Sequence, residues 1–503
     1  MTPFLKEVLQ TVANNVITVI VFAIALLLSS RWYRHRNLPP GPWGLPFIGI
    51  IPFVGTHLHK TMITWSKKYG DVFSFYLGPN LSLAIHGYEN IKEAFVKHGD
   101  HFSGRELMFM VKDTRGKYTG VLINQDKAWQ QHRRFLERIF RELGVAKSTW
   151  ESNIHDELNH FLAEITSKNG EAFDIHQLLN MSVANVTNKI ILGDRFEYSD
   201  ESFQRHVKMI DDIMNNWQLS VFFNMYPWTR LLPGDPTNYF TLKKCEHSRQ
   251  YDVIQPMIDK RKTECEKNGR KNDKDIIGYY LNALEEKDKL VKYSTFEMLQ
   301  LRCIIDDLFF AGTETTSTTM RWALLYMIKY PHIQEKVRQE IFDNIGKGRL
   351  PSLNDRESLP YTEAVLLEIQ RYNSIVPLAV PHQTTADVTF KGYHIPKGVL
   401  VYPNLWALHR DPTLWKNPNI FDPLRFLDEN GHVVKPPHFM PFSIGKRICA
   451  GEVLAKSEMF LYFSTMMQRF NFTFPNGRTT PSMEGVLGIT LCPEPFKLCA
   501  TRI

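Results

Sequence analysis

The sequence is short of cysteine and carries little excess charge, and each shortage excludes a class of function. Six of its 503 residues are cysteines, and none of them forms a C-x-x-C pair or a dense cluster. This spacing argues against a zinc site or a disulfide framework and is typical of a reducing compartment. A net charge of +7 without a concentrated basic stripe argues against a nucleic-acid partner. The chain also lacks G-x-G-x-x-G and P-loop patterns, so we predict no nicotinamide or flavin site in it.

A long apolar run is present near the start of the chain, at residues 9–30. At ~1.5 Å per helical residue it is long enough to cross a bilayer core of ~30 Å, and it predicts one transmembrane helix. A cleaved signal peptide is the alternative. Arg31, Arg34 and Arg36 follow the run directly, so the positive-inside rule places the rest of the chain in the cytosol.

The remaining pattern predicts a single large folded domain. We assign residues 1–30 to a membrane anchor, 31–46 to a basic and proline-rich linker, and 47–503 to the catalytic domain. Helical periodicity dominates from about residue 89 to residue 372. Short alternating segments predict strands at residues 72–77, 81–85, 388–390 and 399–402. The fold is therefore predicted to be mainly α-helical with small β-sheets.

The strongest chemical signal is the segment from Phe442 to Gly451, which reads F-x-x-G-x-R-x-C-x-G and precedes a predicted helix at residues 452–468. We expect the helix N-terminus, Lys446 and Arg447 to favour a thiolate at Cys449, and a thiolate can bind iron at neutral pH. For a lone cysteine, a buried structural role would be the better interpretation. Here the cysteine belongs to a longer and more specific pattern.

With this pattern the chain resembles the cytochrome P-450 superfamily of haem-thiolate monooxygenases. It is most similar to the animal microsomal, family-two type that oxidises drugs, steroids and fatty acids. The resemblance covers nearly everything after residue 37. It implies the cytochrome P-450 fold, haem b as the cofactor, Cys449 as the iron ligand, and Arg447 as a partner of a haem propionate.

A second signal lies within a predicted helix at residues 296–329, in the segment from Ala311 to Thr316. Its glycine and threonines are poor helix formers. We expect Gly312 to leave room over a flat cofactor, and the Thr315 hydroxyl to bond back to the Ala311 carbonyl. An exposed threonine-rich face is the alternative. The segment resembles the family's oxygen-activation motif, which implies that Ala311 contacts haem and that Glu314 and Thr315 relay protons to dioxygen.

Other motifs imply roles around the cofactor. Glu368 and Arg371 lie one helical turn apart and alone would predict only a surface pair. In the family such a pair meets a second arginine, here Arg425, in a cluster that locks the cysteine loop. The resemblance also implies a set of residues that hold the haem propionates alongside Arg447: Arg105, Trp129, Arg133 and His382.

Electrons must come from another protein, because the chain has no evident site for a redox nucleotide. The resemblance implies an NADPH-dependent flavoprotein reductase and, as an additional partner, cytochrome b5. Candidates for a basic docking face are Arg133, Arg134, Arg138 and Lys446. The resemblance further implies a single-pass protein of the endoplasmic reticulum membrane with its catalytic domain in the cytosol. An aromatic and basic stretch at residues 219–232 can reach the membrane interface, although core packing explains it equally well.

These observations predict a monooxygenase that inserts one atom of O₂ into a small lipophilic substrate such as a steroid, fatty acid or xenobiotic. By resemblance, mostly apolar segments line its pocket, at residues 108–120, 219–223, 307–311, 375–380 and 487–489. One alternative is a haem-thiolate isomerase or dehydratase, which needs no external electrons. The other is a non-catalytic membrane protein that binds haem or a ligand. Neither alternative requires the pair of Glu314 and Thr315.

Overall fold

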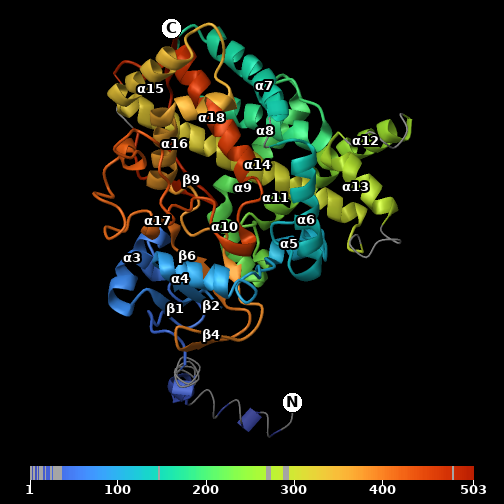
Figure 1. The fold of residues 1–503 in the computed structure, drawn as a ribbon. Coiled ribbons are helices and arrows are strands. Elements are labelled where there is room, and N and C mark those ends of the chain that lie inside the picture. The colour runs from blue at the N-terminus through green and yellow to red at the C-terminus, as the bar shows by residue number, and fades with distance from the viewer. Residues whose placement is uncertain are drawn as a thin grey trace.

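Helices make up most of the protein, and a four-stranded sheet lies at the opposite end from α7, α8 and α15 (Figure 1). The computed structural model describes residues 37–145, 148–267, 274–286, 294–477 and 481–503, together with scattered positions before residue 37. This mainly helical architecture with small sheets confirms the predicted fold class.

The α-helices and the shorter helical turns divide the chain as follows. The α-helices are α3 (Leu58–Tyr69), α4 (Tyr88–Lys92), α5 (Phe109–Arg115), α6 (Asp126–Glu142), α7 (Ser148–Ser167), α8 (His176–Leu192), α9 (Glu201–Asn215), α10 (Trp217–Met225), α11 (Tyr239–Ser248), α12 (Gln255–Lys267), α13 (Ile276–Glu285), α14 (Met298–Lys329), α15 (Pro331–Asn344), α16 (Pro360–Asn373), α17 (Leu405–Leu408) and α18 (Glu452–Arg469). The shorter turns used below are η3 (Pro227–Leu231), η4 (Arg249–Ile254), η7 (Pro423–Phe426) and η8 (Gly445–Arg447).

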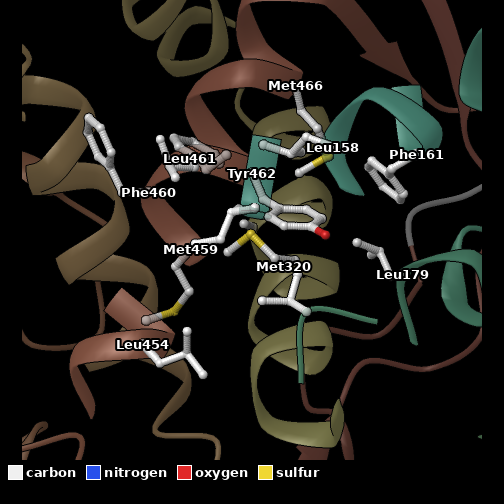
Figure 2. Close-up of a cluster of buried hydrophobic side chains, with 14 of the residues drawn as sticks. Leu158, Phe161, Leu179, Met320, Leu454, Met459, Phe460, Leu461, Tyr462 and Met466 are labelled. Carbon is white, nitrogen blue, oxygen red and sulfur yellow. The ribbon is translucent and has the colours of Figure 1, made fainter. Parts of the chain in front are cut away.

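Helix α14 forms the centre of the helical part and packs against α8, α16 and α18 (Figure 1). Buried residues occur on all its sides rather than along one stripe, which is typical of a helix inside a core. Figure 2 shows part of the largest core cluster, where side chains from α7, α8, α14 and α18 meet. Those labelled include Leu158, Phe161, Leu179, Met320 and Tyr462.

The four-stranded sheet joins parts of the chain that are far apart in sequence. Its order is β1–β2–β6–β3, in which β1 and β2 form a hairpin and β2 pairs in parallel with β6. The two-stranded sheets are β4–β5, β7–β10 and β8–β9. The strands are β1 (Val72–Leu77), β2 (Asn80–Ile85), β3 (His382–Gln383), β4 (Val388–Phe390), β5 (Tyr393–Ile395), β6 (Leu400–Pro403), β7 (Phe470–Thr473), β8 (Val486–Leu487), β9 (Leu491–Cys492) and β10 (Cys499–Arg502).

The predicted elements agree closely with these bounds. The strands predicted at 72–77 and 388–390 coincide with β1 and β4. The strand predicted at 81–85 begins one residue after β2, and the one predicted at 399–402 is shifted by one residue at both ends relative to β6. The long helix predicted from residue 296 begins at Met298. Such differences are small because frayed ends and caps leave the terminal residue of an element weakly specified.

The start of the folded body packs against the sheet. Leu38 is buried, and the backbone N–H and the hydroxyl of Ser74 donate to the carbonyls of Pro40 and Pro39, at 3.2 and 2.6 Å. The predicted anchor at residues 1–30 and the first part of the predicted linker lie largely outside the described residues. Within the described part of the chain, no helix is both long enough and apolar enough to cross a membrane.

Candidate active site

The middle of α14 has one open face. Leu308, Ala311 and Thr315 are exposed or half-buried there, although most residues around them on the helix are buried. Their spacing of i, i+3 and i+7 places them on one side of the helix. The Thr315 hydroxyl donates to the Ala311 carbonyl at 2.9 Å, as predicted. An open face inside a buried helix borders an internal space.

The prediction that Gly312 leaves room over a flat cofactor is wrong. A Cβ atom added to Gly312 would lie 2.6 Å from the hydroxyl oxygen of Thr187 on α8. The glycine therefore allows α8 to approach α14 closely, and Ala311 is the small exposed residue on the open face. The pattern of residues could not distinguish these two positions, because it does not say which neighbour each side of the helix meets.

Backbone geometry fixes the loop that carries Cys449. Ser443 and Gly445 have left-handed φ angles of 65° and 82°. A Cβ atom on Gly445 would lie 2.0 Å from the carbonyl oxygen of Phe95, so only glycine fits there. The backbone N–H of Cys449 donates to the carbonyl of Phe442 at 3.1 Å, which closes the loop before α18 begins.

The Cys449 side chain is exposed, yet the surrounding protein desolvates the thiol and raises its pKa. The backbone N–H of Gly451 and the charge of Arg133 oppose this rise in part. The predicted help from Lys446 is reduced, because that ammonium pairs with Asp100. The expectation that the helix N-terminus, Lys446 and Arg447 favour a thiolate at Cys449 is therefore wrong for the protein without a bound metal ion. A metal cation would lower the pKa of this thiol, because coordination deprotonates a thiol.

A small cavity connects the open face of α14 with the cysteine loop. Its volume is about 40 Å³, and its wall combines residues from α14, the segment after α16, the Cys449 loop and α18. They include Thr315, Thr319, Ile375, Phe442, Ala455 and Met459. Thr315 and the loop that carries Cys449 therefore lie close to the same internal space.

Two arginines near this loop are buried or half-buried without a carboxylate partner. Arg105 donates to the carbonyls of Val380 and Pro381 at 2.9 and 3.0 Å, and Arg447 donates to the carbonyl of Ser103 at 2.8 Å. Burial lowers the pKa of Arg105 to about 9 and that of Arg447 to about 8. In the described part of the chain neither forms an ion pair, and the buried Nε of Arg105 has no hydrogen-bond partner.

The other predicted propionate partners lie beside these arginines. His382 donates through Nδ1 to the carbonyl of Phe102 at 2.7 Å, and burial and then Arg105 hold its pKa well below its usual range. The guanidinium of Arg447 lies 3.8 Å from the ring centroid of Trp129. Arg133 is half-buried and pairs with Glu137 at 2.6 Å. Desolvated cations with few counter-charges form a site suited to anions, and the two carboxylates of haem fit it.

Glu314 is buried and turned towards the β8–β9 hairpin. Its Oε1 accepts hydrogen bonds from the Thr318 and Thr490 hydroxyls at 3.0 and 2.8 Å, and lies 3.3 Å from the Cys492 Sγ. The adjacent Thr315 faces the open side of the helix. The sequence brought Glu314 and Thr315 to attention but carried no signal for Thr490 or Cys492, because their contact with Glu314 is long-range.

The predicted Glu-Arg-Arg cluster is confirmed. Glu368 pairs with Arg371 at 2.7 Å and with Arg425 at 3.1 Å. Arg371 also donates to the carbonyl of His409 at 2.6 Å, and the Nε2 of His409 accepts the backbone N–H of Met440 at 3.1 Å. Since Met440 begins the approach to the cysteine loop, the cluster stabilises the segment that positions Cys449.

Sequence reasoning missed a second buried charge cluster. Arg115 of α5 pairs with Glu246 of α11 and with Asp306 and Asp307 of α14, and Arg249 of η4 pairs with Asp306 at 2.8 Å. Asp307 also accepts the backbone N–H groups of residues 121 and 122, at 2.7 and 2.8 Å. These contacts hold the predicted pocket segment at residues 108–120 against α14.

Comparison with known proteins gives a consistent result along the chain. The protein-family model described as Cytochrome P450 matches residues 39–500. The chain is 40% identical to cytochrome P450 2J2 of Homo sapiens over 492 residues, which are 96% of this chain and 95% of that protein. It is 35% identical to cytochrome P450 2U1 of Rattus norvegicus, over 95% of this chain and 94% of the relative. It is also 35% identical to cytochrome P450 2C25 of Mesocricetus auratus, with 96% and 99% covered.

Proposed function

The chain belongs to the cytochrome P450 family and is a monooxygenase, and from this premise we propose that it oxidises a small lipophilic substrate at a haem held by Cys449. The observation that carries the proposal is the placement of Cys449 and of a group of desolvated cations around one internal site. A haem bound through a cysteine thiolate activates dioxygen and inserts one of its atoms into the substrate.

The residues of the chain hold and orient this cofactor. Cys449 is the iron ligand, and Arg105, Arg447, His382 and Trp129 hold the propionates, with Arg133 behind them. This assignment explains why two guanidiniums are kept from water without a carboxylate from the chain, since the propionates supply the missing negative charge. Ala311, which is small and exposed, lets the cofactor approach α14.

Proton delivery is assigned to α14. The Thr315 hydroxyl is fixed by its bond to the Ala311 carbonyl and faces the internal space, so it can hold a proton donor near bound dioxygen. Glu314 is the acid that resupplies protons from an adjoining, buried side of the helix. The Cys449 site alone would also serve an isomerase, whereas an acid and an alcohol in these positions favour reduction of dioxygen.

The substrate pocket is formed by segments that meet above this site. Helix α5 packs against α10 and α11, residues 120–122 contact Asp307, and the backbone N–H of Leu491 donates to the carbonyl of Ile375 at 2.7 Å. These contacts bring together the predicted pocket segments. The buried charges among them, those of Arg115 and Asp307, are paired with each other, so we propose lipophilic substrates without a fixed charge.

We further propose that the protein works at the endoplasmic reticulum membrane with an NADPH-dependent flavoprotein reductase and cytochrome b5. Phe47, Trp228 and Leu231 are 70%, 61% and 77% exposed, and the Tyr226 hydroxyl donates to the Phe47 carbonyl at 2.8 Å. These apolar groups form one surface suited to a lipid interface. The reductase would dock on the basic face of Arg133, Arg134, Arg138 and Lys446. Its binding there would be weak, because three of these cations, Arg133, Arg138 and Lys446, already pair with acidic residues of the chain.

Substitution of the cysteine tests the proposal. Cys449→Ser should abolish the thiolate-type spectrum of the reduced carbon-monoxide complex, because an alcohol does not replace the thiolate as ligand. Cys303→Ser, which alters a buried cysteine on α14, should keep it. The wild type should consume NADPH only when purified reductase is present. A Cys449→Ser protein that keeps the spectrum, or full product formation without NADPH, would overturn the proposal.

A further inference from the structure

We propose that the Thr490 hydroxyl, with Thr318 and Cys492, positions Glu314 for proton delivery, so that the β8–β9 hairpin sets the state of the acid. This inference rests on the proposed function, in which Glu314 is the acid. Thr318, Thr490 and Cys492 surround one carboxylate oxygen of Glu314. Glu314 and Thr318 belong to α14, whereas Thr490 and Cys492 belong to the β8–β9 hairpin, which is distant in sequence.

The carboxylate is anchored at one oxygen. The two hydroxyls and the thiol all lie within hydrogen-bond distance of Oε1 of Glu314, whereas among the described residues Oε2 accepts no hydrogen bond. One oxygen therefore holds the side chain in place while the other is available to gain and lose a proton.

Among the described residues no cation forms an ion pair with this carboxylate, and Glu314 is 3% exposed. A buried carboxylate without a cation depends on neutral donors to stabilise its charged form. Thr318 belongs to α14 itself, so Thr490 is the hydroxyl donor that comes from another element. Its distance to Oε1 of Glu314 is also the shortest of the three contacts.

The hairpin that carries Thr490 also borders the substrate pocket. Thr490 is buried between β8 and β9, and its carbonyl accepts the backbone N–H of Gly488 at 2.9 Å. The proposed pocket wall at residues 487–489 is therefore part of the same turn. A substrate that moves this turn also moves the donor on which Glu314 depends, which connects occupancy of the pocket with the supply of protons.

One experiment tests the contact without turnover. Glu314→Gln removes the negative charge beside Cys492, and so should lower the pKa of that thiol and raise its rate of alkylation by iodoacetamide about tenfold at a given pH. Burial and then Glu314 raise the pKa of Cys492 to about 11, and Arg321 opposes them and is unchanged in the variant. The rate is read for the peptide that contains Cys492 by mass spectrometry, in the full-length, haem-loaded protein. Glu429→Gln, which changes an exposed carboxylate, is the control. An unchanged rate in Glu314→Gln would overturn the proposal.

A second experiment tests the positioning role with purified reductase. The pH profile of NADPH consumption should contain a limb that Glu314→Gln removes. Thr490→Val should move this limb to higher pH by about one unit, because loss of a donor destabilises the carboxylate, and Thr490→Ser should restore it. A limb that Thr490→Val leaves in place would overturn the positioning role but not the monooxygenase. Absence of any Glu314-dependent limb would remove Glu314 as the acid.

Discussion

Thr315 and Glu314 are adjacent in the chain but face different sides of α14. Neighbouring residues of a helix point about 100° apart, so one can face the internal space while the other enters the protein. The Thr315 hydroxyl lies on the open side and is oriented by the Ala311 carbonyl. A single turn of helix therefore combines an alcohol near the proposed site of oxygen activation with an acid that is shielded from it.

Replacement of Thr315 should separate oxygen consumption from product formation. Thr315→Ala should still bind haem and substrate, because alanine is the better helix former. Product per NADPH should fall and hydrogen peroxide should rise, with ~10²-fold to 10⁴-fold as the upper range for a positioned proton transfer. Simultaneous measurement of NADPH, peroxide and product checks this, and Thr315→Ser is the matched control that keeps the hydroxyl. Unchanged coupling in Thr315→Ala would exclude the relay.

At the scale of elements, the charge cluster around Arg115 connects α5, α11, η4 and α14. Three carboxylates share two guanidiniums there, and all five side chains are largely buried. Burial of such charges gains little net stability, but removal of one partner leaves an uncompensated buried charge. The cluster therefore specifies where α5 sits on the central helix more than it stabilises the fold as a whole.

The Arg115→Met protein should lose stability accordingly. We expect the free energy of unfolding to fall by about 3–5 kcal/mol, because the substitution leaves the buried carboxylate of Asp307 without a cation and leaves Glu246 and Asp306 with Arg249 alone. Arg138→Met removes an exposed pair with Glu142 and should cost less than about 1 kcal/mol. Urea denaturation of the haem-loaded proteins checks both values. Equal losses in the two variants would show that the cluster is not desolvated in solution.

Apart from the Glu368–Arg425 contact, which the family resemblance implied, the sequence predicted what is local in this site and missed what is not. The Cys449 loop and the Ala311–Thr315 bond were predictable because each depends on residues within one short segment. The Arg115 cluster and the Thr490 contact join elements that nothing in their own segments relates. Gly312 was placed correctly as a special position but for the wrong reason, because its neighbour Thr187 lies on another helix.

At the scale of the whole molecule, several histidines are buried in their neutral form. Burial lowers the pKa of His59 and of His206 to about 3 and holds that of His409 well below its usual range. Both ring nitrogens of His206 lack a hydrogen-bond partner among the described residues, and its ring contacts Phe309 at 4.8 Å. His409 uses Nε2 as an acceptor, which requires the neutral ring.

These histidines predict a loss of stability in acid. Below pH ~6.5 the unfolded chain binds protons that the folded chain does not, so the free energy of unfolding falls as the pH drops from ~6.5 towards ~3. Each such group contributes about 1.4 kcal/mol per pH unit within this window. His206→Phe should reduce the slope by that amount, as measured by urea denaturation at several pH values. His432→Gln, which alters an exposed ring, should not, and identical slopes for all three proteins would contradict the prediction.

The parallel pairing of β2 with β6 has a consequence for how the protein is made. Ser82 of β2 can meet Leu400 of β6 only after most of the chain has left the ribosome. Until then the β1–β2 hairpin presents an unpaired strand edge, which invites association with other chains. Such a high contact order also predicts slow completion of the sheet. Synthesis of this protein should therefore depend on chaperones that shield the nascent hairpin until its distant partner strand arrives.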